Sequence, residues 1–359
     1  MTEKEYLVAV STFAPFGPAR VKLLLSYFGA AKKIWKAEPQ KLAKLGLGIE
    51  RTKNFIEYRA NFDAKDYFKK LERLGIGYFT QDDASYPQNL KEIDDVPFVL
   101  YYKGSFKAID TNSIAIVGSR KMTSYGAEVT EKFASELSSF GITIISGLAR
   151  GVDTIAHKAA IEAQGRTLAV VGCGLDSIYP PENSHLAGQV VKHGALVSEY
   201  PMGYPALPTN FPARNRIISG LSKGVLVVEG AEKSGTLLTA SHAANQGRVV
   251  FAVPGAITSP LSAAPLFLIK NGAKMVTGPR DILEELGIEA RLDREKMERV
   301  MPSGRTERAL ITILENEPLH LDEIARISSL GVSDVSARLT IMELKGMVKN
   351  VGRGVYKKI

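Results

Sequence analysis

The chain has 359 residues, of which 45% are apolar and 23% charged, a composition typical of a folded globular protein with two or three domains. A single cysteine, Cys173, excludes an internal disulfide framework, and five scattered histidines show no metal-ligand spacing, so we expect neither a metal nor another cofactor. The formal net charge of +8 favours a polyanionic partner, and without a membrane-spanning stretch or signal peptide we expect a cytoplasmic protein with no membrane partner.

Residues 1–80 predict a small N-terminal domain of short helices. Apolar residues recur three or four positions apart from Pro18 to Phe28, from Arg51 to Arg59 and from Ala64 to Leu74, as in amphipathic helices. Gly29 and Gly46-Leu47-Gly48 are typical helix ends. The spacing resembles that of SAM-like or helix-hairpin-helix units, and the latter grip nucleic-acid backbone. Generic helical packing explains the same spacing and is our preferred interpretation.

Residues 81–289 predict an α/β domain with a doubly wound, mostly parallel, Rossmann-like sheet. Apolar runs alternate there with helix-length segments, which is the pattern of parallel strands covered by helices on both faces. The predicted strands are Ile114 to Val117, Ile142 to Ile145, Leu168 to Val171, Ala195 to Ser198, Val225 to Val228 and Val249 to Val253. Ligand sites of such domains lie at the carboxyl ends of the strands.

The most informative of the turns that follow these strands is Ser146-Gly147-Leu148-Ala149-Arg150-Gly151-Val152-Asp153. A glycine turn between a strand and a helix leaves backbone N–H groups that can bind an anion, together with the positive end of the helix dipole. The ligand could be a mononucleotide, a dinucleotide or a nucleic-acid backbone. For Asp153 itself we favour the capping of exposed N–H groups.

Three further turns carry glycine or basic residues: Gly118-Ser119-Arg120, the segment from Asn210 to Arg216, and the segment from Glu232 to Thr236. Of the two arginines in the second turn, we expect one to meet the ligand while the other braces the fold. The predicted ligand-contact residues are Gly118, Ser119, Arg120, Ser146, Gly147, Arg150, Gly151, Arg214, Arg216, Lys233, Ser234, Gly235 and Thr236.

Motifs for nucleotide chemistry are missing from these turns. Neither the G-x-x-x-x-G-K-[ST] spacing of a P-loop nor the G-x-G-x-x-G dinucleotide fingerprint is present. We expect His157 to pack or bond locally and Cys173 to be a buried, inert thiol. Glu199 and Glu229 both follow predicted strands and could act as an acid–base pair, but the sequence does not fix their separation.

The C-terminal part predicts a linker at 290–303 and a winged-helix domain at 304–359. Three amphipathic helices, Glu307 to Leu314, Leu321 to Ile327 and Val332 to Lys345, precede two short alternating segments joined at Gly352-Arg353-Gly354. The second helix of a helix-turn-helix could read DNA. Here that helix offers only Arg338 and Lys345 as cations, so a protein contact or dimerisation is at least as well supported.

Several segments in one order resemble the DNA-processing protein A family (DprA, also called Smf), in its three-domain variant. They are Tyr86-Pro87-Gln88-Asn89-Leu90, Pro97 to Tyr101, Val117-Gly118-Ser119-Arg120, Ser146 to Asp153, Tyr179-Pro180, Phe211 to Ser222, Ser234-Gly235-Thr236 and Val253-Pro254-Gly255. The resemblance implies a non-enzymatic, dimeric protein that binds and protects incoming single-stranded DNA and helps to load the RecA recombinase in natural transformation.

The same resemblance implies roles for particular residues. Arg120 and Lys233 would be the strongest DNA contacts. An anion cradle would be formed by Ser119, Ser146, Gly147 and Gly151, with Arg214 or Arg216 nearby. One departure from the family pattern places Ala264 and Leu266 where a glycine and an asparagine are usual, which predicts the loss of a polar contact.

Two other functions remain open from the sequence. Phosphoribohydrolases use a similar fold with a PGGxGTxxE motif, but here Lys233-Ser234-Gly235-Thr236 lacks both early glycines and Thr239 replaces the glutamate. A ligand-sensing transcription regulator would combine a nucleotide-binding central domain with a DNA-reading winged helix, and the poorly basic recognition helix counts against it.

Overall fold

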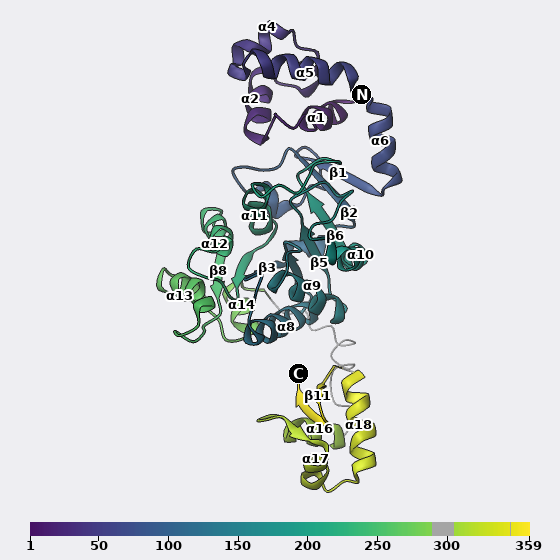
Figure 1. Cartoon of the computed structure of the whole chain (residues 1–359), viewed down its shortest axis with the longest axis vertical. Coiled ribbons are helices and arrows are strands. Elements are labelled where there is room, and N and C mark those ends of the chain that lie inside the picture. Colours follow the sequence, from purple (N-terminus) through teal and green to yellow (C-terminus); the bar gives the residue numbers. More distant parts are fainter. Residues whose placement is uncertain (289–304, 345) are drawn as a thin grey trace. The chain divides into compact units, whose positions relative to one another are not determined.

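The computed structural model describes residues 1–288, 305–344 and 346–359, and they form two compact units, one within 1–289 and the other within 290–359 (Figure 1). The predicted linker 290–303 and Lys345 lie outside the described residues. In the described ranges no helix has both the length and the apolar character needed to cross a bilayer.

The first unit begins with helices that enclose an aromatic core. Thr2 caps the first helix, because its Oγ1 accepts from the Glu5 N–H at 3.3 Å while the Glu5 carboxylate accepts from the Thr2 N–H. Phe13 and Phe55 lie in this core with their ring centroids 5.3 Å apart. The helices are α1 (Glu3–Ser11), α2 (Pro18–Phe28), α3 (Ala31–Lys36), α4 (Pro39–Leu42), the π-helical turn η1 (Ala43–Leu47), α5 (Ile49–Asn61) and α6 (Ala64–Arg73).

A nine-stranded sheet follows, in the order β1-β2-β6-β5-β4-β3-β7-β8-β9. All six predicted strands are present, and they pair in parallel. Their bounds are β3 (Ser113–Val117), β4 (Thr143–Ser146), β5 (Thr167–Val170), β6 (Gly194–Ser198), β7 (Gly224–Val227) and β8 (Val249–Ala252). The predicted fold class is confirmed.

Three strands of the sheet were not predicted. β1 (Ile76–Thr80) and β2 (Val99–Gly104) pair antiparallel at one edge, and the two-residue strand β9 (Lys274–Met275) lies at the other. Only part of β1 is buried, so it lacks the continuous apolar run of the parallel strands. The sheet therefore begins within the range assigned by sequence to the helical domain.

Helices cover both faces of this sheet (Figure 1). Ile217 and Ala240, from α11 and α12, pack with Ala115 and Leu168, whereas α10 packs against the opposite face at Leu196. The helical elements are α7 (Gln88–Lys91), η2 (Ala108–Thr111), α8 (Ser124–Ser139), α9 (Val152–Glu162), η3 (Pro181–Asn183), α10 (Ser184–His193), α11 (Asn210–Leu221), α12 (Gly235–Asn245), η4 (Pro260–Ser262), α13 (Ala263–Lys270) and α14 (Pro279–Glu285).

The strand order of the sheet predicts the place of a ligand-binding crevice, between β3 and β7. From β3 the chain adds β4, β5 and β6 on one side and then returns to place β7 on the other. In open parallel sheets, ligands bind outside the carboxyl ends of the strands at such a switch point. The loops after β3 and β7, which carry Arg120 and Lys233, flank this point.

In its described residues, 305–344 and 346–359, the second unit has the predicted three helices and a small sheet. Its elements are α16 (Arg305–Ile313), β10 (Leu319–His320), α17 (Leu321–Ser328), α18 (Val332–Leu344), β11 (Val348–Gly352) and β12 (Val355–Lys358), with strand order β10-β12-β11. Leu310, Ile324 and Leu339 meet in its core. Arg338 is exposed on α18, the helix predicted as the recognition helix.

At the amino ends of the central strands, Asp110 joins three segments. The Arg166 guanidinium, just before β5, donates to both carboxylate oxygens at 2.7 and 2.8 Å, and Thr143, at the start of β4, donates to Oδ1 at 2.8 Å. Asp110 is 5% exposed and Arg166 17%. The pair is thus shielded from water. Removal of one partner would leave the charge of the other buried and uncompensated.

We predict that Asp110→Ala lowers the free energy of unfolding by about 3 kcal/mol, the scale for a broken buried pair. Glu38→Ala is the control, because Glu38 pairs with Lys41 at the surface, and its loss should cost less than about 1 kcal/mol. Urea unfolding followed by circular dichroism measures both. Equal effects of the two substitutions would contradict the structural role of Asp110.

Candidate functional site

The turn after β4 is held from within the protein. The Ser146 hydroxyl is buried and donates to the Ile116 carbonyl at 2.7 Å. Asp153 Oδ2 accepts from the backbone N–H groups of Gly147 at 3.0 Å and Ala149 at 3.3 Å, so it binds N–H groups of the turn before α9 and not those of the helix start, where a cap was predicted. Ser146 and Gly147 therefore brace the turn in this structure instead of presenting free donors to an anion.

Gly151 allows the turns after β3 and β4 to touch. Its φ is +75°, and a Cβ there would lie 2.2 Å from the Ser119 carbonyl oxygen, so a larger residue would force the two backbones apart. The same carbonyl accepts from the Val152 N–H, the first of α9, at 3.2 Å. The geometry thus ties Gly151 to close packing of the two turns.

Arg214 lies inside the carboxyl edge of the sheet, only 4% exposed. Its Nη1 donates to the carbonyl oxygens of Gly147, at 2.7 Å, and Val170. Burial lowers the pKa of its guanidinium to about 10, which leaves the group protonated at neutral pH, and Asp153 opposes that decrease. A guanidinium so placed fixes the ends of β4 and β5.

Arg216 is buried too, at 5% exposure. Its Nη2 binds Glu199 at 2.7 and 2.8 Å, and its Nε binds Asp95 at 2.8 Å. Burial raises the pKa of Glu199, although Arg216 acts in the opposite direction. Both arginines of the turn therefore brace the fold, contrary to the prediction that one of them meets the ligand.

Glu229 occupies the N-terminus of α8. Its carboxylate accepts from the Thr123 N–H at 2.9 Å and from the Thr123 hydroxyl, and it lies so close to Gly126 that a Cβ there would be 2.3 Å from Oε2. Glu199 and Glu229 are thus engaged by separate partners. An acid–base pair formed by these two carboxylates is not supported.

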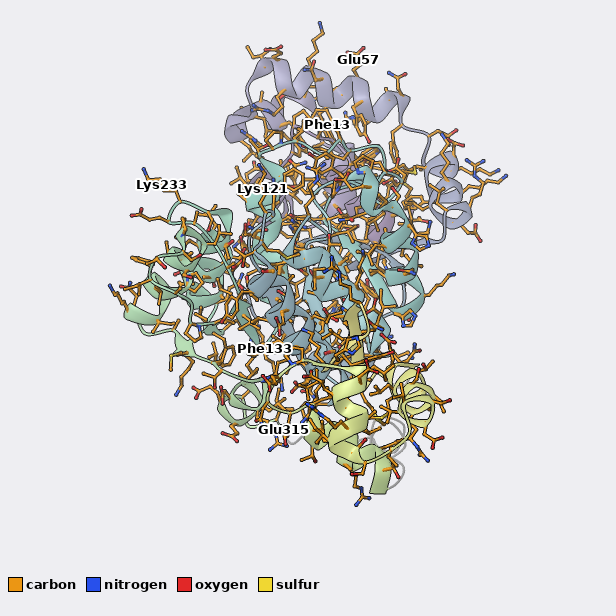
Figure 2. All side chains as sticks on the ribbon, turned by 60° about the horizontal axis from the view of Figure 1, so that its bottom comes forward. Phe13, Glu57, Lys121, Phe133, Lys233 and Glu315 are labelled. Carbon is orange, nitrogen blue, oxygen red and sulfur yellow. The ribbon has the colours of Figure 1, made fainter. Side chains whose placement is uncertain are left out.

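The start of α12 differs from those of α8 and α9. A buried carboxylate lies at each of the other two, Glu229 and Asp153, but in the described chain Ser234 makes no side-chain cap bond at α12 and its buried Oγ lacks a hydrogen-bond partner. Lys233 is exposed beside it and projects from the surface (Figure 2). Gly235 and Thr236 form the first helical positions, so this end can accept an anion.

An aromatic pair that was not predicted from the sequence, Tyr179 and Phe211, lies beside Arg120. The Phe211 and Tyr179 ring centroids are 5.5 Å apart, and the Arg120 guanidinium lies 5.7 Å from the Phe211 centroid. Arg120 is exposed, and Tyr179 is 43% exposed. Each of the two aromatic residues precedes a proline in a motif that carries the family resemblance. These motifs are the sequence feature from which a role for the two rings could have been predicted. A cation next to accessible rings can bind phosphate and stack on bases.

The remaining predicted residues lie around this edge. A Cβ on Gly118 would lie 2.6 Å from Val152 Cγ2, so Gly118 serves the packing of the loop against α9. Ser119 Oγ accepts from the Lys121 N–H at 3.1 Å. Arg150 is exposed and pairs with Glu182 across the surface. The burial predicted for Cys173 is confirmed, and it raises the pKa of the thiol.

The unusual Ala264 lies next to the loop after β7. Its N–H donates to the Gly230 carbonyl at 2.9 Å, and a Cβ on Gly230 would lie 3.1 Å from the Ala264 Cβ. Ala264 is fully buried, whereas Leu266 is partly exposed on α13. The departure from the family pattern therefore adds apolar packing behind the loop that carries Lys233.

His157 bonds locally, as predicted. Its Nδ1 lies 2.7 Å from the Thr167 hydroxyl, and the ring is fully buried. Burial, followed by repulsion from Arg214, lowers its pKa to about 3. The imidazole is therefore neutral in the folded protein at neutral pH.

This shift makes part of the stability depend on pH. In the unfolded chain a histidine titrates near pH 6.5, so below that value the unfolded state binds a proton that the folded state excludes. We predict that the free energy of unfolding of the wild type, relative to His157→Asn, falls as the pH is lowered from about 6.5 toward about 4. Urea titrations of both proteins across this range measure the difference. A difference independent of pH would contradict the buried, neutral histidine.

Comparisons with known proteins agree with this architecture. Residues 77–287 match the family described as DNA recombination-mediator protein A, and residues 297–352 match the DprA winged helix domain. Protein Smf of Synechocystis sp. is 34% identical over 384 residues, covering 97% of this chain and 96% of that protein.

Two solved structures are similar over most of their own length. DNA processing protein A from Streptococcus pneumoniae is 35% identical with a TM-score of 0.68, covering 79% of this chain and 98% of that one. DNA processing protein A from Helicobacter pylori is 30% identical with a TM-score of 0.53, covering 58% of this chain and 95% of that one. The latter structure concerns a single-stranded DNA binding mode.

Proposed function

Since the chain belongs to the DNA recombination-mediator protein A family, we propose that it binds single-stranded DNA without sequence preference and protects it. The relative from Helicobacter pylori supports the choice of ligand, because its structure concerns single-stranded DNA binding. The net charge of +8 is suited to a polyanion.

The observation that carries this proposal is the arrangement of charge at the carboxyl edge of the sheet. Arg214 and Arg216 are buried and bound to protein groups, so the cations offered to a ligand are the exposed Arg120, Lys121 and Lys233. Strand phosphates bind at Arg120 and at the start of α12, and bases stack on the Phe211 and Tyr179 rings.

The site holds its ligand without a reaction. Glu199 and Glu229, the carboxylates nearest to a catalytic role, are committed to Arg216 and Thr123. His157 is buried and Cys173 lies beneath the surface. The residues at this edge therefore favour binding of a ligand by cations and aromatic rings over the catalysis expected of a phosphoribohydrolase.

We further propose a homodimer formed at the β8–β9 end of the sheet. Large apolar side chains are exposed on elements next to β8: Leu238 on α12, Phe267 on α13, Met275 on β9, and Ile257, which is 90% exposed, in the loop after β8. Exposed apolar residues gathered on one side mark association surfaces. In a symmetric dimer these side chains would be buried on both protomers.

The cellular role that we propose is the family's role in natural transformation. The bound strand would be incoming DNA in the cytoplasm, and the partner would be the RecA recombinase. The family's description as a recombination mediator supports this assignment. The poorly basic α18 of the second unit favours protein contact over duplex readout, which disfavours a transcription regulator.

We predict that Arg120→Ala and Lys233→Ala each weaken binding of a labelled oligothymidylate at least about tenfold. Each should also flatten the salt dependence of binding by about 0.7 for every phosphate that the variant no longer neutralises. Lys158→Ala, which removes an exposed lysine on α9, is the matched control and should leave affinity unchanged within about twofold. Fluorescence anisotropy at several salt concentrations measures both quantities.

A second arm separates stacking from charge. Phe211→Leu should weaken binding by about 1 kcal/mol or more, the scale of one stacked base, and leave the salt slope unchanged. A duplex of the same length should bind more weakly than the single strand. Normal binding by both cation variants, or preference for one particular duplex, would overturn the proposal.

The dimer proposal predicts that Phe267→Glu converts the protein to a monomer, because a buried unpaired carboxylate opposes association. Tyr27→Glu is the control, since Tyr27 is 60% exposed on α2, away from this surface. Sedimentation velocity over a range of concentrations measures the change. A wild type that stays monomeric, or a Phe267→Glu variant that still dimerises, would exclude this interface.

A further inference from the structure

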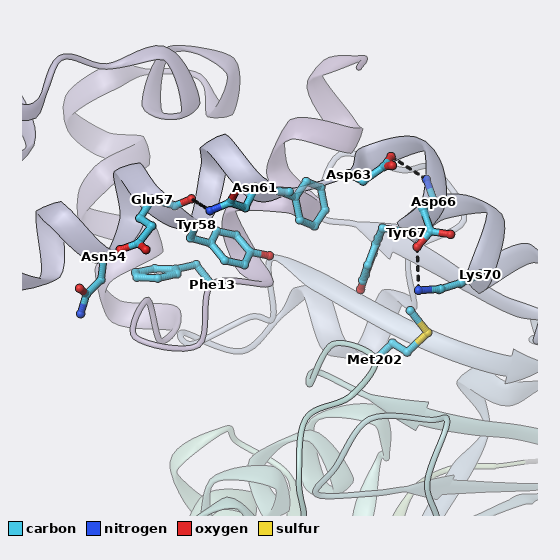
Figure 3. Close-up of a pocket in the computed structure, with 11 residues that line it drawn as sticks. Phe13, Asn54, Glu57, Tyr58, Asn61, Asp63, Asp66, Tyr67, Lys70 and Met202 are labelled. Atoms are coloured by element: carbon cyan, nitrogen blue, oxygen red, sulfur yellow. Dashed lines mark hydrogen bonds and ion pairs between the residues drawn. The ribbon is translucent and has the colours of Figure 1, made fainter.

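A pocket of about 680 Å³ lies in the first unit, where α5 and α6 meet the loop between β6 and α11 (Figure 3). It is a wide, open hollow, and its volume is in the range of ligand-binding clefts. Phe13, Tyr58, Tyr67 and Met202 line it, and none of them belongs to the proposed DNA site or the proposed dimer surface. The pocket is therefore available for a separate role.

The lining contains an unbroken row of four aromatic rings. Centroid separations are 5.2 Å from Phe13 to Tyr58, 5.6 Å from Tyr58 to Phe62 and 5.4 Å from Phe62 to Tyr67. The Tyr58 hydroxyl lies 2.6 Å from the Thr12 hydroxyl, and the Tyr67 hydroxyl is directed at the buried Tyr101. Phe13 is buried in the aromatic core, so the ring surface that is open to a ligand belongs to the partly exposed Tyr58, Phe62 and Tyr67.

The rim of the pocket is acidic in a basic chain. Glu57, Asp63 and Asp66 lie on it with one cation, Lys70, which Asp66 binds at 2.7 Å. Asp63 accepts from the Asp66 N–H as the cap of α6. Among the described residues the Glu57 carboxylate has no ion-pair partner, and the side chain is exposed at the pocket edge (Figures 2 and 3). A phosphate would be repelled here.

Aromatic faces carry negative charge density, and surrounding carboxylates add to it, so this combination selects a cation. A guanidinium fits better than an ammonium, because it is planar and stacks on rings. A free amino acid would bring its own carboxylate to the acidic rim, whereas an arginine within a peptide would not.

We propose that this pocket is a docking site for a partner protein that inserts an arginine, flanked by apolar residues, between the aromatic row and Glu57. The site is independent of DNA binding, because its charge excludes the strand and none of its residues is among the proposed DNA contacts. It provides a third interaction surface on the same unit, besides the proposed DNA site and dimer surface.

The test uses the full-length protein and a fluorescein-labelled peptide of alternating leucine and arginine, compared with a peptide that has citrulline in place of arginine. Citrulline keeps the shape and removes the charge, so we expect the arginine peptide to bind at least about fivefold more tightly. Added salt should weaken only the arginine peptide. Equal affinities, or no binding of the arginine peptide, would overturn the proposal.

Two variants locate the site. Glu57→Lys should weaken binding of the arginine peptide about fivefold or more, whereas Glu72→Lys, the same charge change at an exposed position of α6 outside the pocket, should change it less than about twofold. Phe62→Leu, which removes one ring surface, should also weaken binding, by about threefold. Thermal unfolding verifies that each variant is folded.

Binding of labelled oligothymidylate keeps this proposal separate from the DNA site. The Glu57→Lys and Glu72→Lys variants should bind oligothymidylate with the same affinity. This expectation holds whether or not the Arg120→Ala variant binds oligothymidylate more weakly. A selective increase for Glu57→Lys would show that the strand passes the pocket and would overturn the proposal. Equal peptide affinities of the two lysine variants would do the same.

Discussion

The buried guanidinium of Arg214 is the interaction on which the carboxyl edge of the sheet depends. It donates to carbonyl oxygens at the ends of two neighbouring strands, β4 and β5, and so fixes the turns that follow them. A charge in this position requires a compensating carboxylate, and Asp153 supplies it while also binding two N–H groups of the same turn. Burial, followed by repulsion from Arg214, lowers the pKa of His157 and keeps that ring neutral.

This constraint divides the charged groups of the edge into two classes. Arg214, Arg216, Asp153 and Glu229 are buried and bonded within the protein, so they shape the loops. Arg120 and Lys233 are exposed on loops that are held in place by those bonds. An edge that is braced by internal bonds and carries exposed cations suits a ligand that is long and charged and whose sequence varies.

Much of the fold could be predicted from sequence, because buried parallel strands require continuous apolar runs, and all six such runs form strands. β1 and β2 were not predicted, because they are partly exposed and pair antiparallel, so they lack the continuous apolar run of a buried parallel strand. The family motifs led to the loops at the carboxyl edge of the sheet. They could not separate Arg120 from Arg214, since burial of an arginine depends on strands far away in the chain.

The aromatic features show the same limit. Tyr179 and Phe211 come from different loops, and their adjacency follows from the strand order and not from local spacing. The acidic pocket likewise brings Met202 to Tyr67 across a large part of the first unit's sequence. Sequence patterns predict which faces of helices and strands are buried. Contacts between loops that lie far apart in the sequence depend on the order of the strands in the folded sheet.

We propose that a DNA strand binds at the exposed loops after β3 and β7, because the turn after β4 is already bonded internally. Amide hydrogen exchange with and without an oligothymidylate tests this most directly. We predict slower exchange at residues 118–122 and 230–237, with the largest effect at the start of α12. Protection confined to the second unit, or no change at 230–237, would contradict it.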